Sequence, residues 1–278
     1  MAAEAGARLG IIAGGGALPL RLAAACRASG RPFLVAALKG QAAPEAMAGL
    51  PHAWVRLGAA GGLCHLLREA GVGAVVLAGT VRRPSVLALF PDLLALRLLL
   101  RAGGLAVGDN RLMMHIVLAL ERELGVPVLA PSDLLPDCLA PTGPLGRLAP
   151  LAADAPDIAL GLAAAAAHGA RDVGQACVVQ QGRVLALEDR RGTDALIERS
   201  RALRRPGRGP ILVKTKKPQQ DLRADPPAVG PETVRRAAAA GFAGLALGAG
   251  SVVLIDREAL VAAADEAGLF VAGVAGAR

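Results

Sequence analysis

Polar side chains gather between residues 212 and 230, in a chain that otherwise consists largely of Ala, Leu, Gly and Val. Three lysines, including Lys214 and Lys217, share this stretch with the carboxylates of Asp221 and Asp225. Prolines at 218, 226 and 227 exclude a helix over most of it. Lysine ammonium groups suit phosphate charge, and paired carboxylates suit a divalent cation. A solvated surface loop held by ordinary ion pairs is the alternative on composition alone.

Further carboxylates belong to the same half of the chain. Glu188 is the last residue of a predicted strand, and Asp194 stands in Gly192-Thr193-Asp194, where a helix is predicted to begin. Two or three of the carboxylates at 188, 194, 221 and 225 can hold Mg²⁺ through oxygen atoms and water. A metal, cationic donors and a positioned water are the parts that hydrolysis of a phosphoanhydride requires. The alternative for Thr193 and Asp194 is a simple helix cap.

A glycine loop lies near the start of the chain, in the sequence GIIAGGGALP at residues 10–19. Glycines between a strand and a helix let backbone N–H groups approach a phosphate. Pro19 stands where the third glycine of a dinucleotide fingerprint would fall, and the next strand ends at Leu38-Lys39 without an acidic residue. NAD is therefore disfavoured, and Gly14, Gly15 and Gly16 are predicted to contact a phosphate or a sugar. A tight turn without a ligand is the alternative.

Two more motifs follow predicted strands or precede helices. Gly79, Thr80, Arg82 and Arg83 come directly after a buried strand, where α/β proteins place ligands, and the arginines suit a diphosphate. The alternative is a surface turn with a solvated arginine pair. Asp109, in Gly-Asp-Asn, is on its own better explained as a helix cap.

The elements that position these motifs alternate in type. In the first half we predict strands at 8–13, 33–38, 53–57, 74–78 and 126–130, and helices at 18–28, 63–70, 84–101 with Pro91 as a break, and 111–124. Strand, glycine turn, helix and strand form a right-handed βαβ unit. The first half is therefore predicted as a Rossmann-like α/β domain with a mostly parallel sheet.

The second half has a different order of predicted helices and strands. We predict helices at 154–168, 193–204, 231–240 and 257–267, and strands at 176–180, 183–188, 210–214, 245, 252–255 and 269–274. Gln181-Gly182 marks a hairpin between two of these strands. Prolines at 131, 136, 141, 144 and 150 mark a linker. The predicted fold class is α/β, with an N-terminal domain at 1–131, a linker at 132–150 and a mixed α/β catalytic domain at 151–278.

The composition excludes several classes of protein. The formal net charge of +8 suits an anionic partner, but aromatic residues are only 2% and no Lys/Arg-rich run is present, so nucleic acid is disfavoured. The four cysteines form no CxxC and the four histidines no HExxH, which disfavours zinc and fits reduced thiols in the cytoplasm. No signal peptide is recognised. Glycines interrupt the uncharged run 237–255, which is predicted as strands and turns rather than a membrane span.

Seven motifs taken together resemble the LpxI-type UDP-2,3-diacylglucosamine pyrophosphatases. They lie at residues 10–19, 78–84, 172–175, 192–194, 214–218, 220–223 and 225–230, so that the resemblance covers nearly the whole chain. It implies hydrolysis of UDP-2,3-diacylglucosamine to UMP and 2,3-diacylglucosamine 1-phosphate (lipid X) in lipid A synthesis, with Mg²⁺ or another divalent cation. It also implies two α/β domains, a homodimer, and a cytoplasmic protein in peripheral contact with the inner membrane.

The family's essential carboxylate, in an Arg-x-Asp-x-Pro motif, falls on Asp225. Combining residues and resemblance, we predict catalysis by Asp225, Asp194 and Lys214. The predicted metal ligands are Asp225, Asp194, Asp221 and Glu188. The residues predicted to bind substrate are Gly14, Gly15, Gly16, Gly79, Thr80, Arg82, Asp109, Gln175, Gly192, Thr193, Lys217, Gln220 and Arg223.

Two positions depart from the family pattern. Asn110 follows Asp109 where relatives often carry a second Asp, which argues against a metal role there, and Pro226 replaces an apolar residue. Residues 86–100 carry ten Leu, Val or Phe, and we hypothesise that they bind acyl chains or dock on a membrane. A dimer interface or plain core is the competing explanation.

A non-catalytic nucleotide- or phosphosugar-binding regulatory protein is the alternative function. The clustered carboxylates favour the enzyme, because an anion binder gains nothing from negative charge near a phosphate.

Overall fold

The computed structural model describes residues 6–81, 90–102 and 109–276, and it divides into two compact units. Unit 1 comprises Met1–Pro136 together with Asp221–Asp225, and unit 2 comprises Asp137–Gln220 and Pro226–Arg278. The sequence places residues 221–225 in the second half of the molecule, whereas in the structure they group with unit 1. No feature of the sequence indicates this exchange.

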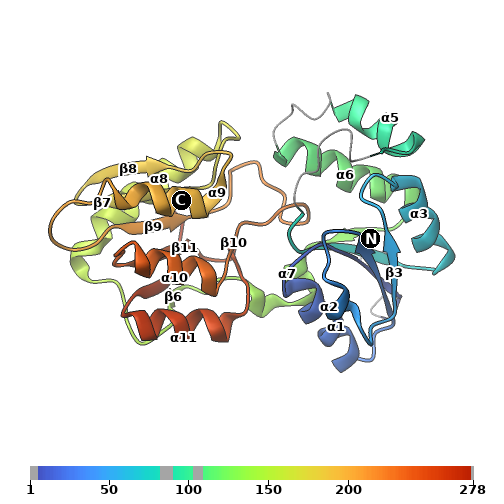
Figure 1. Ribbon diagram of the computed structural model, residues 1–278, viewed down its shortest axis with the longest axis horizontal. Helices are drawn as coiled ribbons and strands as arrows, with labels where there is room; N and C mark the ends of the chain where they lie inside the picture. The colour runs from blue at the N-terminus through green and yellow to red at the C-terminus, as the bar shows by residue number, and fades with distance from the viewer. Residues whose placement is uncertain (1–5, 82–89, 103–108, 277–278) are drawn as a thin grey trace. The chain divides into compact units, whose positions relative to one another are not determined.

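Unit 1 is built on a parallel sheet (Figure 1). The strand order is β3-β2-β1-β4-β5. Its strands are β1 (Leu9–Ala13), β2 (Phe33–Leu38), β3 (His52–Val55), β4 (Ala74–Ala78) and β5 (Val128–Leu129). β1 and β4 are continuous apolar runs, as expected where helices cover both faces of a parallel sheet. The prediction of a Rossmann-like α/β domain is confirmed.

Helices cover the two faces of this sheet. They are α1 (Leu18–Ala28), α2 (Pro44–Met47), α3 (Ala60–Glu69), α5 (Leu93–Ala102), α6 (Asp109–Leu124) and α7 (Pro131–Leu134). Leu22 of α1 packs with Ile11 in the core on one face. Leu67 of α3 and Val117 of α6 pack with Ile12 on the other. Because Ile11 and Ile12 are consecutive strand residues, their side chains point to opposite faces.

The direction in which strands are added reverses between β1 and β4. From β1 the chain adds β2 and β3 on one side, and later β4 and β5 on the other. In open α/β sheets, ligands bind outside the carboxyl ends of the strands at such a switch point. In unit 1 the switch point lies where Ala13 pairs with Ala78, directly before two glycine-containing loops.

Unit 2 contains a mixed sheet with the order β6-β13-β11-β9-β7-β8. Its strands are β6 (Gly143–Pro144), β7 (Ala176–Gln180), β8 (Arg183–Leu187), β9 (Ile211–Lys214), β11 (Gly244–Gly248) and β13 (Phe270–Val274). Strands β9, β11 and β13 are parallel, and β7 runs antiparallel to β9. A second sheet pairs β10 (Ala228–Val229) with β12 (Val253–Leu254). The predicted mixed α/β character is confirmed.

One face of the mixed sheet is covered by α8 (Ala155–Gly169), and the other by α9 (Gly192–Arg201), α10 (Pro231–Ala239) and α11 (Arg257–Ala267) (Figure 1). Helix α8 approaches closely because Gly161 has no side chain: a Cβ there would lie 2.3 Å from Cγ2 of Val213. Cys177 is packed under the same helix and donates to the Gly161 carbonyl at 3.2 Å. Burial raises the pKa of the Cys177 thiol to about 12.

Most predicted elements are present. The helices at 18–28 and 257–267 and the strands at 33–38, 74–78 and 176–180 have the predicted bounds. Gln181 and Gly182 have φ of 51° and 71°, as a type I′ hairpin turn requires. The run 237–255 forms the end of α10, then β11 and β12. Within the three described ranges, no helix is both long and apolar enough to traverse a bilayer.

Two predicted segments differ in detail. Residues 84–89 of the predicted helix 84–101 lie outside the described residues, and α5 begins at Leu93, after Pro91. The predicted linker 132–150 is partly structured: it contains most of α7, the 3₁₀ turn η1 (Pro136–Cys138) and β6, which extends the sheet of unit 2. The 3₁₀ turn η2 (Ala152–Asp154) then leads into α8.

Candidate functional site

In unit 1, the structure brings two predicted motifs together at the switch point. The loop after β1 and the loop after β4 form an isolated bridge between Gly15 and Thr80. The Gly15 N–H donates to the Thr80 carbonyl at 2.8 Å, and the Thr80 N–H donates back to Gly15 at 2.9 Å. Gly14 donates to the Ala78 carbonyl at 2.8 Å. Gly15 and Thr80 are 65 positions apart in the sequence, and their pairing joins the two motifs into one backbone platform.

Glycine is required there for close approach. A Cβ at Gly14 would lie 2.4 Å from the Thr80 oxygen, and one at Gly79, which has φ of 91°, would lie 2.4 Å from the Gly15 oxygen. Any other residue type would push the two loops apart. Since the N–H groups of Gly14 and Gly15 already have carbonyl partners, a phosphate at this platform would need other donors. Gly16, Gly79 and the exposed Thr80 stay predicted contacts.

The other predicted residues of the first half are described less fully. Arg82 lies outside the described residues. Asp109 is the first residue of α6, and its side chain is not described. Their predicted contacts with substrate stay predictions.

In unit 2, a buried lysine lies at the carboxyl end of β9. Its position follows from the sheet: Lys214 pairs with Ala176 at the start of β7, and Glu188 directly follows β8, so three strand ends meet at one edge. Lys214 Nζ donates to Thr193 Oγ1 and to the Ala228 carbonyl, each at 2.9 Å. Thr193 Oγ1 donates to Glu188 Oε1 at 2.5 Å. Lys214 and Glu188 are each only 5% exposed, so one hydroxyl connects two buried, opposite charges.

Glu188 is held by further contacts. Its Oε2 accepts from the Gln175 backbone N–H at 2.7 Å, and its carbonyl oxygen lies 2.6 Å from Nε2 of His168. Gly174 is needed beside it, because a Cβ there would lie 2.5 Å from the Glu188 oxygen. The side-chain oxygen of Gln175 is buried and has no hydrogen-bond partner among the described residues, which is costly unless a ligand supplies a donor.

A second buried lysine is already paired. Lys217 Nζ lies 2.6 Å from Asp172 Oδ1, and its side chain is 9% exposed. The Lys217 N–H donates to Oε1 of the buried Gln220 at 2.9 Å. Asp172 has a left-handed φ of 58°, which aims its carboxylate at this lysine from the turn after α8. Asp172 belongs to the motif at residues 172–175, but the sequence gives no sign that it pairs with Lys217.

Residues 221–225 are anchored in unit 1 by charge and by packing. Arg223 donates to both oxygens of Asp221 and to Glu121 Oε1 of α6, the latter at 2.9 Å. The hydrogen bond with Asp221 raises the pKa of the Arg223 guanidinium. Ala224 is 6% exposed and belongs to the core of unit 1. Asp225, the next residue, is exposed. Nothing in the sequence marks Glu121, an ordinary position on an amphipathic helix, as the anchor.

The remaining predicted residues lie at the start of α9. Gly192 has φ of 84°, a conformation that favours glycine. Asp194 is exposed, and Arg236 Nε lies 3.5 Å from it. The nearby arginines form a surface network: Arg191 and Arg199 lie 2.7 and 2.9 Å from Asp189. Hydrogen bonding from Arg191 holds the pKa of Asp189 well below its usual range.

The predicted carboxylates fall into different units: Asp221 and Asp225 in unit 1, Glu188 and Asp194 in unit 2. Among residues 6–81, 90–102 and 109–276, no group of three or more His, Cys, Asp or Glu could hold a metal ion. Mg²⁺ commonly takes one or two carboxylates and completes its shell with phosphate oxygens and water. The predicted carboxylates of each unit are compatible with a site of this kind.

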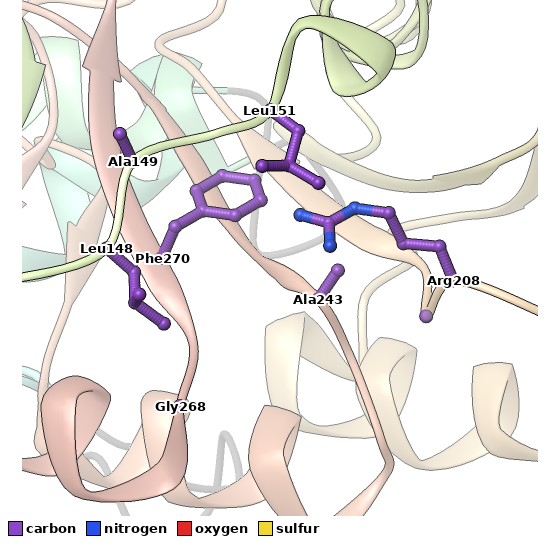
Figure 2. Close-up of a pocket in the computed structure, with 8 residues that line it drawn as sticks. Leu148, Ala149, Leu151, Arg208, Ala243, Gly268 and Phe270 are labelled. Carbon is purple, nitrogen blue, oxygen red and sulfur yellow. The ribbon is translucent and has the colours of Figure 1, made fainter.

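A pocket of about 320 Å³ opens at the opposite edge of the unit 2 sheet (Figure 2). Ala243 and Phe270, at the amino ends of β11 and β13, line it with Leu148 and Leu151. Its charged member, Arg208, lies 2.5 Å from Asp154 in an ion pair. None of the predicted site residues lines this pocket, so it is not part of the candidate site.

Comparison with known proteins covers both halves. A family model described as the LpxI N-terminal domain matches residues 8–138, and one described as the LpxI C-terminal domain matches residues 141–272. The chain is 40% identical over 280 residues to UDP-2,3-diacylglucosamine pyrophosphatase LpxI of Caulobacter vibrioides. The alignment covers 96% of this chain and 97% of that relative.

Proposed function

Because the chain belongs to the LpxI family over both of its halves, we propose that it hydrolyses UDP-2,3-diacylglucosamine to UMP and lipid X in lipid A biosynthesis. The observation that carries the proposal is the 40% identity, along 96% of the chain, with a relative named as this pyrophosphatase. The net charge of +8 is consistent with an anionic diphosphate substrate.

In unit 2, Lys214 is the group proposed to neutralise phosphate charge. Thr193 and the Ala228 carbonyl fix its ammonium group, and Glu188 fixes Thr193. A cation that is held in place before substrate arrives stabilises developing charge without the cost of reorganisation. Thr193 and Glu188 are thus proposed as positioning residues. The buried side-chain oxygen of Gln175 offers an acceptor to a hydroxyl or N–H group of the substrate.

Asp225 is the carboxylate proposed to hold a divalent cation such as Mg²⁺. It is exposed, and the two residues before it are fixed in unit 1 by Glu121 and by the core. Asp194 is also exposed and stays a second candidate. Glu188 and Asp221 fit less well, because both oxygens of each already accept hydrogen bonds. When bound, the cation would neutralise phosphate oxygens and acidify a water.

We further propose a cytoplasmic protein in peripheral contact with the inner membrane, since substrate and product both carry two acyl chains. The homodimer is proposed from the family resemblance. Sedimentation velocity of the purified protein tests it.

The test of function is UMP release from UDP-2,3-diacylglucosamine by wild type and by Asp225→Asn. Asparagine keeps the shape of the side chain and removes its charge. The matched control is Glu69→Gln, which removes another exposed carboxylate of unit 1. We expect wild type and Glu69→Gln to turn over with Mg²⁺ and to stop with chelator, and Asp225→Asn to bind substrate without turnover.

Other outcomes decide between the alternatives. If folded wild type binds substrate tightly but shows no turnover with any divalent metal, the protein is a non-catalytic binding protein and not a hydrolase. Turnover that persists in chelator would refute the metal requirement. Full activity of Asp225→Asn would move the essential carboxylate elsewhere.

A further inference from the structure

One helix of unit 1 exposes a row of large apolar side chains. Phe90 is 72% exposed, and Leu93, Leu96 and Leu100 of α5 are 65%, 44% and 71% exposed. The spacing of three and four residues places the three leucines on one face of the helix, and Phe90 lies just before its start. On the other side, Ala95 is buried and Leu94 packs into the core. A row of this kind is uncommon on a soluble surface and marks an interaction site.

The helix is fixed so that this row faces outward. Asp92 Oδ1 accepts from the Ala95 N–H at 2.9 Å and caps the helix, while its Oδ2 accepts from the Gly61 N–H of α3 at 2.7 Å. One carboxylate therefore joins the first turns of two helices. Helix α5 also packs against α6 and α3 (Figure 1). The leucines are therefore exposed on a helix that is already packed against α3 and α6.

The charged side chains of α5 have one sign. Arg97 and Arg101 are exposed on α5, each one residue after an exposed leucine. The helix sequence, LLALRLLLRA, contains no carboxylate. The closest acidic residue before it, Asp92, is engaged in the cap. An apolar row flanked by arginines has the composition of helices that lie in the plane of a lipid surface.

A second copy of the chain fits this face poorly. Ten helical residues are about 15 Å long and about 10 Å wide, a footprint of about 150 Å², against about 800 Å² per partner in a stable interface. Pairing α5 with its own copy would also bring Arg97 and Arg101 toward the same residues of the partner. An anionic lipid surface instead accepts the leucines below its headgroups and neutralises the arginines at phosphate level.

We infer that Phe90 and the exposed face of α5 dock this protein on an anionic lipid surface. The inference deepens the membrane contact of the proposed function and rests on it only for the biological purpose, which is access to a substrate with two acyl chains. Docking itself requires no hydrolysis, so the two ideas are tested separately.

The experiment is flotation of the full-length protein with vesicles of phosphatidylcholine containing phosphatidylglycerol, and with phosphatidylcholine alone. The test variant is Leu93→Gln with Leu100→Gln. The matched control is Leu151→Gln with Leu203→Gln, exposed leucines of unit 2 at 54% and 47%. We expect wild type and control to float with anionic vesicles, and the α5 variant to partition about tenfold or more weakly. Arg97→Gln and Arg101→Gln should each weaken binding about fivefold, with a smaller salt dependence.

Three results would overturn the inference. One is absence of wild-type binding to anionic vesicles, and another is equal loss in the α5 and control variants. The third is an α5 variant that still floats but has lost self-association in sedimentation, or has lost turnover of long-acyl substrate in detergent. Unchanged turnover of a short-acyl analogue shows that the α5 variant is folded. Vesicle binding by a protein that hydrolyses nothing would refute the proposed function and leave docking intact.

Discussion

Thr193 occupies a position where one hydroxyl group serves two buried charges. It accepts from Lys214 Nζ at 2.9 Å and donates to Glu188 Oε1 at 2.5 Å. Thr193→Val keeps the branched shape and removes both hydrogen bonds. Thr193→Ser is the matched control, because it keeps the hydroxyl and removes only a methyl group.

The magnitude follows from the burial of the two partners. Hydrogen bonds to charged groups contribute about 1.5–3 kcal/mol each, and Lys214 and Glu188 are too buried for water to replace the lost partner. Two lost bonds therefore cost about 3 kcal/mol or more. For a unit of this size about 3–4 °C corresponds to each kcal/mol, so the melting temperature of unit 2 should fall by about 10 °C. Thr193→Ser should stay within about 1 kcal/mol of wild type.

The same change tests the proposed role of Lys214. Without the hydroxyl, the ammonium group loses one of the contacts that fix it, and we expect kcat to fall about tenfold or more at a temperature where the variant is folded. The assays are thermal unfolding by circular dichroism and UMP release, on wild type and both variants. The reasoning would be refuted by a Thr193→Val protein that melts within about 2 °C of wild type and retains its kcat.

Two further predictions concern Glu121 and Cys177. Glu121→Gln weakens the partly exposed ion pair with Arg223, so we expect kcat to fall about fivefold, equal to about 1 kcal/mol, with KM nearly unchanged. The control is Glu123→Gln, at an exposed neighbouring position. Equal kcat values in the two variants would contradict the role of Glu121 as the anchor of residues 221–225. Because burial raises the folded pKa of Cys177 from 9.0 to about 12, its contribution to stability is complete below pH 9 and is lost as pH rises toward 12. The free energy of unfolding should fall over this interval by up to about 1.4 kcal/mol per pH unit, less so in Cys177→Ala, and identical slopes in both proteins would show that the thiol ionises without penalty.

Local structure could be predicted where residue type alone decides it. Helix α1 begins at Leu18 with proline in its first turn, and the hairpin turns at Gln181-Gly182, because these residues restrict the backbone whatever surrounds them. The apolar runs of β1 and β4 indicate a sheet covered on both faces for a similar reason. Two-residue strands such as β6 and β10 could not be predicted, since only pairing partners distant in sequence define them.

The residues of the candidate site were found from the sequence because lysines and carboxylates are conspicuous in so apolar a chain. Their partners were not: the contacts of Lys214 with Thr193, of Lys217 with Asp172 and of Arg223 with Glu121 join residues 21, 45 and 102 positions apart. Composition and spacing determine which chemical groups the protein carries. The tertiary structure alone decided which charges are paired and buried, because sheet order and chain reversal bring distant strand ends to one edge.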